Sequence, residues 1–271
     1  MKVINLIVGI EAVQKSKIRC FVSDKMENIR LNYFPEKGII EFAGHNYLAE
    51  IVHKHQFQFN KVIRSAIKGN ITLGQTIHCV FIEGFNFLND ADYTQFILMD
   101  RREGKLDIST SETEMEDIHK IYADGSFASE TKQSGYGGFI EDPEGNREIF
   151  SKSFNDGSSN LMELLAVTEG LQRLKTVNKI QVNTDSRFVI RGLVQWVHFW
   201  KYNNWQTAYD SKVKYAKSWQ KIDQLCEGKI LEFNWIKGHS GHKEQDFCHQ
   251  LARQSATHSN GNLSANPNEM Y

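Results

Sequence analysis

The sequence predicts two domains, a small β-rich domain at the N-terminus and an α/β domain in the C-terminal half. A chain of 271 residues has room for two domains of ordinary size. Apolar residues make up 40% of the chain, which is enough to build packed cores. Residues 102–119 lack apolar periodicity and concentrate Ser, Thr, Asp and Glu, which is typical of a polar linker. We therefore place the domain boundary there.

The N-terminal domain is expected to span residues 1–101 as a module of short strands. The opening apolar run soon meets Glu11 and Lys15 without a small-residue cleavage pattern, so it predicts a first strand and not a signal peptide. Alternating apolar and polar residues predict further strands, with glycines marking the turns, at residues 17–22, 39–42 and 76–82.

The C-terminal domain is expected to span residues 120–258, with elements in the order βββαβααβα. Strands are predicted at residues 121–123, 135–140, 147–154, 179–186 and 230–238. Helices are predicted at residues 161–174, around Val189, Leu193, Trp196 and Trp200, at residues 213–226, and around Phe247, Leu251 and Ser255. Residues 259–271 are expected to form a flexible polar tail.

The charge and cysteine content of the chain limit which binding partners and which cellular compartment we expect for it. The chain has 32 basic and 33 acidic residues, so any contact with nucleic acid requires local clustering of Lys and Arg. Cys20, Cys79, Cys226 and Cys248 form no CxxC pair, which disfavours a zinc knuckle and a disulfide scaffold. No stretch approaches the roughly 20 apolar residues of a membrane span. We expect a soluble protein without a membrane partner, in the cytoplasm, or in the nucleus if the source is eukaryotic.

Three carboxylates are candidates for one metal site. Asp124 and Asp185 each end a predicted strand, and strand ends of an open α/β sheet face the ligand crevice. Glu163 begins a predicted helix, where Asn160 as N-cap and Glu163 three residues later also fit a capping box without catalysis. If the three elements are adjacent, the repulsion between their carboxylates requires a cation. Hard oxygen ligands of this kind favour Mg²⁺ or Mn²⁺.

Four segments in this half of the chain carry a resemblance to a known family: IYADGSF, SNLMELLAV, VNTDSRFVIRGLVQWVHFWK and FNWIKGHSGHKEQ. They resemble the successive motifs of bacterial-type ribonuclease HI, from residue 120 to about residue 256. The resemblance implies a ribonuclease H-like mixed five-stranded sheet flanked by helices. It also implies an endonuclease that hydrolyses the RNA strand of RNA/DNA hybrids with two metal ions, held by Asp124, Glu163 and Asp185.

Two histidines are further catalytic candidates. His239 matches the histidine of a mobile loop in the family, which implies a role in proton transfer or product release. His249 stands where the resemblance implies a fourth metal-site carboxylate, and its imidazole can ligate metal or relay a proton. Asp246 lies one helical turn earlier. A second interpretation follows from His249, namely an RNA/DNA hybrid-binding protein whose turnover is impaired.

Substrate contacts are expected at two places. Ser158, Ser159 and Asn160 match positions that contact phosphate or the minor groove in the family, and Arg187 is a further candidate whose alternative is a structural surface role. Aromatic residues interleave with lysines along a segment that resembles the basic protrusion of the family, although helix core is the alternative for part of it. The candidates there are Trp196, Trp200, Lys201, Trp205, Lys212 and Lys214.

The N-terminal domain carries no recognised motif. His45, His53, His55 and His78 lack cysteine partners, so surface or strand histidines explain them better than a metal site. The sequence leaves three roles open for this domain: binding nucleic acid, binding a protein partner, or self-association.

Overall fold

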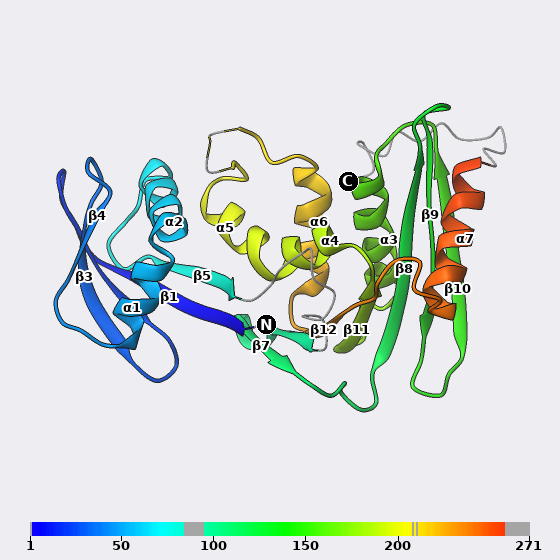
Figure 1. Cartoon of the computed structure of the whole chain (residues 1–271), viewed down its shortest axis with the longest axis horizontal. Helices are drawn as coiled ribbons and strands as arrows, with labels where there is room; N and C mark the ends of the chain where they lie inside the picture. Colours follow the sequence, from blue (N-terminus) through cyan, green and yellow to red (C-terminus); the bar gives the residue numbers. More distant parts are fainter. Residues whose placement is uncertain (1, 84–94, 208, 210, 258–271) are drawn as a thin grey trace. The chain divides into compact units, whose positions relative to one another are not determined.

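The structure of the chain is a computed structural model that describes residues 2–83, 95–207, 209 and 211–257. The predicted tail at residues 259–271 lies outside the described residues. Contacts divide the chain into two compact units (Figure 1). Unit 1 contains Met1–Lys2, Gly84–Leu193 and Tyr215–Tyr271, and unit 2 contains Val3–Glu83 and Val194–Lys214. This grouping differs from the prediction, which placed residues 194–214 in the C-terminal domain.

Unit 2 is built on a five-stranded sheet in the order β4-β3-β2-β1-β5, in which β1 to β4 pair antiparallel. The strands are β1 (Lys2–Val13), β2 (Ile18–Ser23), β3 (Asn28–Phe34), β4 (Ile39–Phe42) and β5 (Thr76–Glu83). Their alternating burial follows the alternation in the sequence, as in β2, where Ile18, Cys20 and Val22 are buried. The strands predicted for this part of the chain are confirmed.

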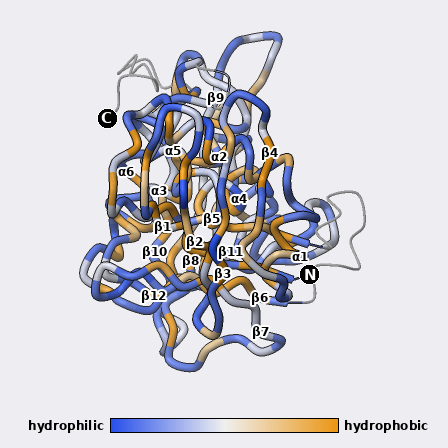
Figure 2. The backbone as a smooth tube through the Cα atoms, turned by 90° about the vertical axis from the view of Figure 1, so that its left-hand side faces the viewer, coloured by the Kyte–Doolittle hydropathy of each residue, from blue (hydrophilic) through white to orange (hydrophobic). Residues whose placement is uncertain are grey.

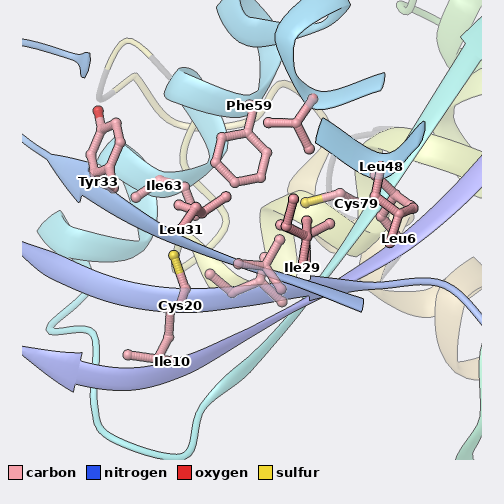
Figure 3. Close-up of a cluster of buried hydrophobic side chains, with 14 of the residues drawn as sticks. Leu6, Ile10, Cys20, Ile29, Leu31, Tyr33, Leu48, Phe59, Ile63 and Cys79 are labelled. Atoms are coloured by element: carbon pink, nitrogen blue, oxygen red, sulfur yellow. The ribbon is translucent and has the colours of Figure 1, made fainter. Parts of the chain in front are cut away.

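Two helices that the strand pattern did not predict cover one face of this sheet. They are α1 (Tyr47–Lys54), which begins after the N-cap Asn46, and α2 (Gln56–Lys68). Leu48 and Val52, and then Phe59 and Ile63, recur at a spacing of four residues and are buried. Figure 3 shows Phe59 and Ile63 pointing from α2 toward strand residues such as Leu31. The N-terminal module is therefore β-rich as predicted, and it also carries two helices on its sheet.

Unit 1 is built on a seven-stranded mixed sheet in the order β10-β9-β8-β11-β12-β6-β7. The central pairs β8–β11 and β11–β12 are parallel, and the other pairs are antiparallel. The strands are β6 (Phe96–Asp100), β7 (Asp107–Ser111), β8 (His119–Ala128), β9 (Gln133–Glu141), β10 (Arg147–Phe154), β11 (Lys179–Thr184) and β12 (Ile230–Trp235). The predicted five-stranded ribonuclease H-like sheet is present and carries two additional strands.

The two additional strands correct the predicted domain boundary. Strand β6 falls inside the predicted N-terminal module, and β7 falls inside the predicted linker at residues 102–119, after a short 3₁₀ helix η2 (Arg102–Gly104). Ile97 and Met99 of β6 and Ile108 of β7 are buried, which attaches both strands to unit 1. A polar strand such as β7 suits the edge of a sheet, where side chains and backbone meet water.

Helices cover both faces of the sheet in unit 1, with α3 (Ser159–Arg173) on one side and α7 (Lys243–Thr257) on the other (Figure 1). Helix α6 (Ala216–Cys226) packs beside α3. The helix predicted near Val189 is split into α4 (Arg187–Arg191), a π-helical turn η3 (Gly192–Trp196) and α5 (Val197–Tyr202). The order of elements from β8 to α7 otherwise follows the prediction.

The hydropathy of the residues differs between the strands and the connecting loops. The strands carry much of the hydrophobic sequence, whereas many connecting loops are hydrophilic (Figure 2). All four cysteines are buried free thiols. Among the residues that the structure describes, no helix has the length and apolar character needed to cross a membrane.

Candidate metal centre

Three carboxylates from three separate elements meet in unit 1. Asp124 lies in β8, Glu163 lies in the second turn of α3, and Asp185 directly follows β11. Each offers an oxygen, and these three oxygens all lie within 4.8 Å of one another. Strands β8 and β11 are parallel neighbours whose last registered pair is Tyr122 with Asn183, so Asp124 and Asp185 both lie just beyond it. The structure thus brings together the acidic residues that the sequence suggested.

Glycine makes the close approach between β8 and α3 possible. A Cβ atom on Gly125 would collide with the backbone nitrogen of Glu163 and with the backbone of Met162. The N-cap of α3 is Ser158, whose side chain accepts a hydrogen bond from the Leu161 backbone nitrogen at 3.3 Å, and not Asn160 as predicted. Because Glu163 is then five residues past the cap, the capping-box explanation for this residue is wrong.

The three carboxylates repel one another when no cation lies between them. Burial, the charges of Asp124 and Asp185, and a hydrogen bond with Asp124 hold the pKa of Glu163 well above its ordinary range. Burial and the charge of Asp124 raise the pKa of Asp185 to about 6, although His249 and His239 act in the opposite direction. Glu163 Oε2 and Asp185 Oδ1 are buried with no hydrogen-bond partner among the described residues. Two buried carboxylate oxygens without partners are suited to bind a hard divalent cation.

Two residues that the sequence did not single out, Trp235 and Gly238, lie against Asp185 and help to fix its position. The indole nitrogen of Trp235 donates a hydrogen bond to the Asp185 carbonyl oxygen at 2.9 Å. A Cβ atom on Gly238 would lie 2.7 Å from Asp185 Oδ2, so any residue other than glycine at position 238 would displace that oxygen. Arg187, a predicted substrate contact, lies over the Trp235 ring with 4.3 Å between its guanidinium carbon and the ring centroid.

The two candidate histidines lie beside the carboxylates. His249 comes from α7, and its Nδ1 lies 2.8 Å from Asp124 Oδ2, a hydrogen bond that orients this carboxylate. His239 is exposed in the loop before α7, and its ring centroid is 5.0 Å from that of His249. Neither histidine nor Asp246 belongs to the group of three carboxylates. Metal ligation by His249 stays a prediction, and the observed contact is with Asp124.

The serine-rich start of α3 lies next to Glu163 in the sequence and is accessible. Ser159 and Asn160 are exposed, whereas Ser158 is half-buried. The Ser158 hydroxyl also shares a hydrogen bond of 2.6 Å with the hydroxyl of Tyr215, which precedes α6 in a left-handed conformation. Tyr215 therefore fixes the Ser158 side chain, a role that no sequence pattern indicated. The predicted substrate contacts of these residues remain predictions.

The residues of the basic protrusion that are predicted to contact the substrate lie in unit 2. Neighbouring tryptophan rings lie 5.9 Å apart for Trp196 and Trp200 and 6.5 Å apart for Trp200 and Trp205. Exposed lysines surround them in the sequence, at Lys201, Lys212 and Lys214. Trp219, by contrast, is fully buried against Gly192 and Phe188, so this tryptophan is core.

The pKa of Asp185 leads to a prediction on pH and stability. Its folded value of about 6 lies above the ordinary 3.8, so the folded state prefers the protonated carboxyl. Above about pH 6 the metal-free fold therefore carries a penalty on the order of 3 kcal/mol, which disappears as the pH falls toward 4. We expect Asp185→Asn to raise the melting temperature in EDTA at about pH 7.5 and to have a much smaller effect at about pH 4. An equal effect at both pH values would contradict the prediction.

Comparison with known proteins agrees with this geometry. The family model described as RNase H matches residues 116–257, about half of the chain. The chain is 39% identical over 137 residues to Ribonuclease H of Idiomarina loihiensis, covering 51% of this chain and 87% of the relative. It is 36% identical over 137 residues to Ribonuclease HI of Vibrio parahaemolyticus, covering 51% of this chain and 88% of the relative.

Among solved structures, the chain is similar to the PFV RNase H domain with a TM-score of 0.46 and 18% sequence identity, covering 53% of this chain and 96% of that one. The sequence matches carry the assignment, and the match to the family model begins at residue 116, after β7. Given the converging carboxylates and these matches, the chain belongs to the RNase H family and its C-terminal half is a ribonuclease H.

Proposed function

We propose that the chain is a metal-dependent endonuclease that hydrolyses the RNA strand of RNA/DNA hybrids by a two-metal mechanism. The observation that carries this proposal is the convergence of Asp124, Glu163 and Asp185, with two buried carboxylate oxygens left without a hydrogen-bond partner among the described residues. The RNase H family depends on metal, and this donor set fits it because all three groups are hard oxygen ligands. Mg²⁺ is the expected ion, and Mn²⁺ is the alternative.

Each part of the site has an assigned task in this proposal. Asp124, Glu163 and Asp185 would hold the cations, which supply an activated water and stabilise the leaving oxygen when bound. His249 would orient Asp124 through the 2.8 Å contact. The exposed imidazole of His239 would carry a proton to or from solvent, because a ring nitrogen of imidazole can accept or donate a proton. Ser159 and Asn160 would contact the hybrid beside Glu163.

The test is cleavage of a hybrid with the RNA strand labelled, with Mg²⁺ or Mn²⁺, by the wild type and by Asp124→Asn. We expect short RNA products from the wild type, no products from the variant, and no cleavage of the same sequence as duplex DNA. Absence of wild-type cleavage with either metal would refute the proposed activity.

A second candidate function rests on the identity of residue 249. Since a histidine stands where the family resemblance implies a fourth carboxylate, the chain could bind hybrids with impaired turnover. In that case the wild type binds the hybrid with strong salt dependence but does not cut it, and His249→Asp restores cutting. The same cleavage assay with His249→Asp separates the two candidates.

The contact between His249 and Asp124 gives a prediction for an active enzyme. His249→Ala is expected to lower the rate about 10- to 100-fold and to raise the metal concentration needed for half-maximal rate, because Asp124 loses its orienting partner. His249→Asn should recover part of both effects, since its amide can still donate to Asp124. Gln250→Ala, an exposed neighbour on α7, is the matched control. An unchanged metal dependence of His249→Ala would exclude the positioning role.

A further inference from the structure

Unit 2 joins the basic protrusion to the N-terminal module through one core. Tyr202 at the end of α5 packs against the buried cluster of β1–β5, α1 and α2. The side-chain amide of Gln195 donates a hydrogen bond to the Val80 carbonyl of β5 at 2.6 Å. Helix α5 also contacts α2. The N-terminal module therefore supports the protrusion and lies in the same compact unit, so its surface residues can act together with those of the protrusion.

Three residues form a patch that this core does not explain, which we name the Lys61 patch: Phe57 and Lys61 of α2, and Tyr209 of the protrusion. Phe57 is 68% exposed and Tyr209 is 76% exposed. The Lys61 ammonium lies 4.3 Å from the Phe57 ring centroid and 5.0 Å from that of Tyr209. It also donates a hydrogen bond to the Tyr209 hydroxyl at 2.9 Å. The exposed aromatic rings of Phe57 and Tyr209 thus both contact the Lys61 ammonium.

The two segments that carry the Lys61 patch have an excess of positive charge. Helix α2 contains Lys61, Arg64 and Lys68 and no acidic residue. Residues 194–214 contain three lysines and a single aspartate. Because the whole chain has a net charge of only -1, this local excess of positive charge is a property of these two segments. A strand of phosphates is the complementary partner.

We propose that the Lys61 patch binds single-stranded nucleic acid, with a base on an aromatic face and a phosphate at Lys61. Unpaired bases expose the faces that stack on Phe57 and Tyr209, whereas a duplex hides its base faces and offers mainly phosphates. Sequence-tolerant binding of single strands commonly combines aromatic platforms with cationic grooves. This inference deepens the proposed function: substrates with an unpaired DNA or RNA stretch beside the hybrid would be bound more tightly than blunt hybrids.

The test measures binding of labelled single-stranded oligo-dT and oligo-U to the full chain by fluorescence anisotropy in EDTA at several salt concentrations. Phe57→Ala is expected to weaken affinity about fivefold or more, and Phe57→Tyr to retain it. Lys61→Glu is expected to weaken affinity and to reduce the slope of log affinity against log salt. Met26→Ala, an 89% exposed residue, and Lys15→Glu, an exposed lysine, are the matched controls in unit 2. The DNA and RNA oligonucleotides show which strand the patch prefers.

Unchanged affinity in both Phe57→Ala and Lys61→Glu would overturn the inference, and so would equal losses in the two controls. Binding of a poly-glutamate peptide as tight as that of the oligonucleotides would overturn it in favour of an acidic protein partner. Cleavage of a blunt hybrid by the wild type is measured in parallel. If the wild type does not cleave the hybrid but Phe57→Ala weakens oligonucleotide binding, the proposed enzyme activity is refuted and the Lys61 patch is supported. If the wild type cleaves the hybrid but Phe57→Ala leaves oligonucleotide binding unchanged, only the Lys61 patch is refuted.

Discussion

Replacing Asp124 by asparagine is expected to reduce hybrid cleavage about 10³-fold or more and to stabilise the metal-free protein. The loss follows because an amide is a poor substitute for a carboxylate as ligand of a divalent cation. Stability rises because the charge of Asp124 is one cause of the raised pKa values of Glu163 and Asp185. Relief of that repulsion is expected to raise the melting temperature at neutral pH in EDTA.

Asparagine preserves the local geometry, which makes the two effects separable. The Asp124 side chain accepts a hydrogen bond from the Gly125 backbone nitrogen at 2.7 Å and contacts His249, and an amide can make both contacts. Asp156→Asn is the matched control, because Asp156 accepts the same hydrogen bond from Gly157 at 2.7 Å but lies outside the carboxylate group. Activity is measured as the initial rate on labelled hybrid, and stability as the melting temperature in EDTA. A variant that loses activity and also melts earlier would indicate misfolding instead.

The fold of the C-terminal half was predictable because its buried residues recur with clear periods. Strand β9 and helix α3 lie where the apolar pattern places them. Strand β7 was not predictable in this way, because Ile108 is its only apolar residue and its pairing with β6 depends on tertiary structure. The missed helices α1 and α2 did carry a signal, the four-residue spacing of Leu48 and Val52 and of Phe59 and Ile63.

The candidate site was predictable to the extent that its residues carry charge. The three carboxylates stand in recognisable motifs, and the structure brings their oxygens together. Gly125 and Gly238 were not recognised because their contribution is the absence of a side chain, which matters only once α3 and Asp185 lie against them. The contact of His249 with Asp124 likewise joins residues 125 positions apart, and the hydrogen bond of Tyr215 with Ser158 joins residues 57 apart.

Gly125→Ala is expected to reduce cleavage about 100-fold although it removes no charged group of the site. The added Cβ would meet the backbone of Met162 and Glu163, which cannot turn away as the end of a flexible side chain could. Helix α3 must then move away from β8, and the Glu163 carboxylate moves with it. Overpacking of this kind also destabilises a fold by about 1–3 kcal/mol. Rate and metal dependence are therefore measured well below the melting temperature of the variant.

The matched control is Gly44→Ala, because a Cβ atom there meets nothing within 4 Å. We expect this control to retain wild-type rate and stability. Gly125→Ala should need more metal for half-maximal rate, since a displaced Glu163 no longer shares a cation with Asp124 and Asp185. A simple loss of folded protein would lower the rate without changing that metal requirement. An unchanged requirement would therefore mean that the approach of α3 to β8 stabilises the fold but does not build the metal site.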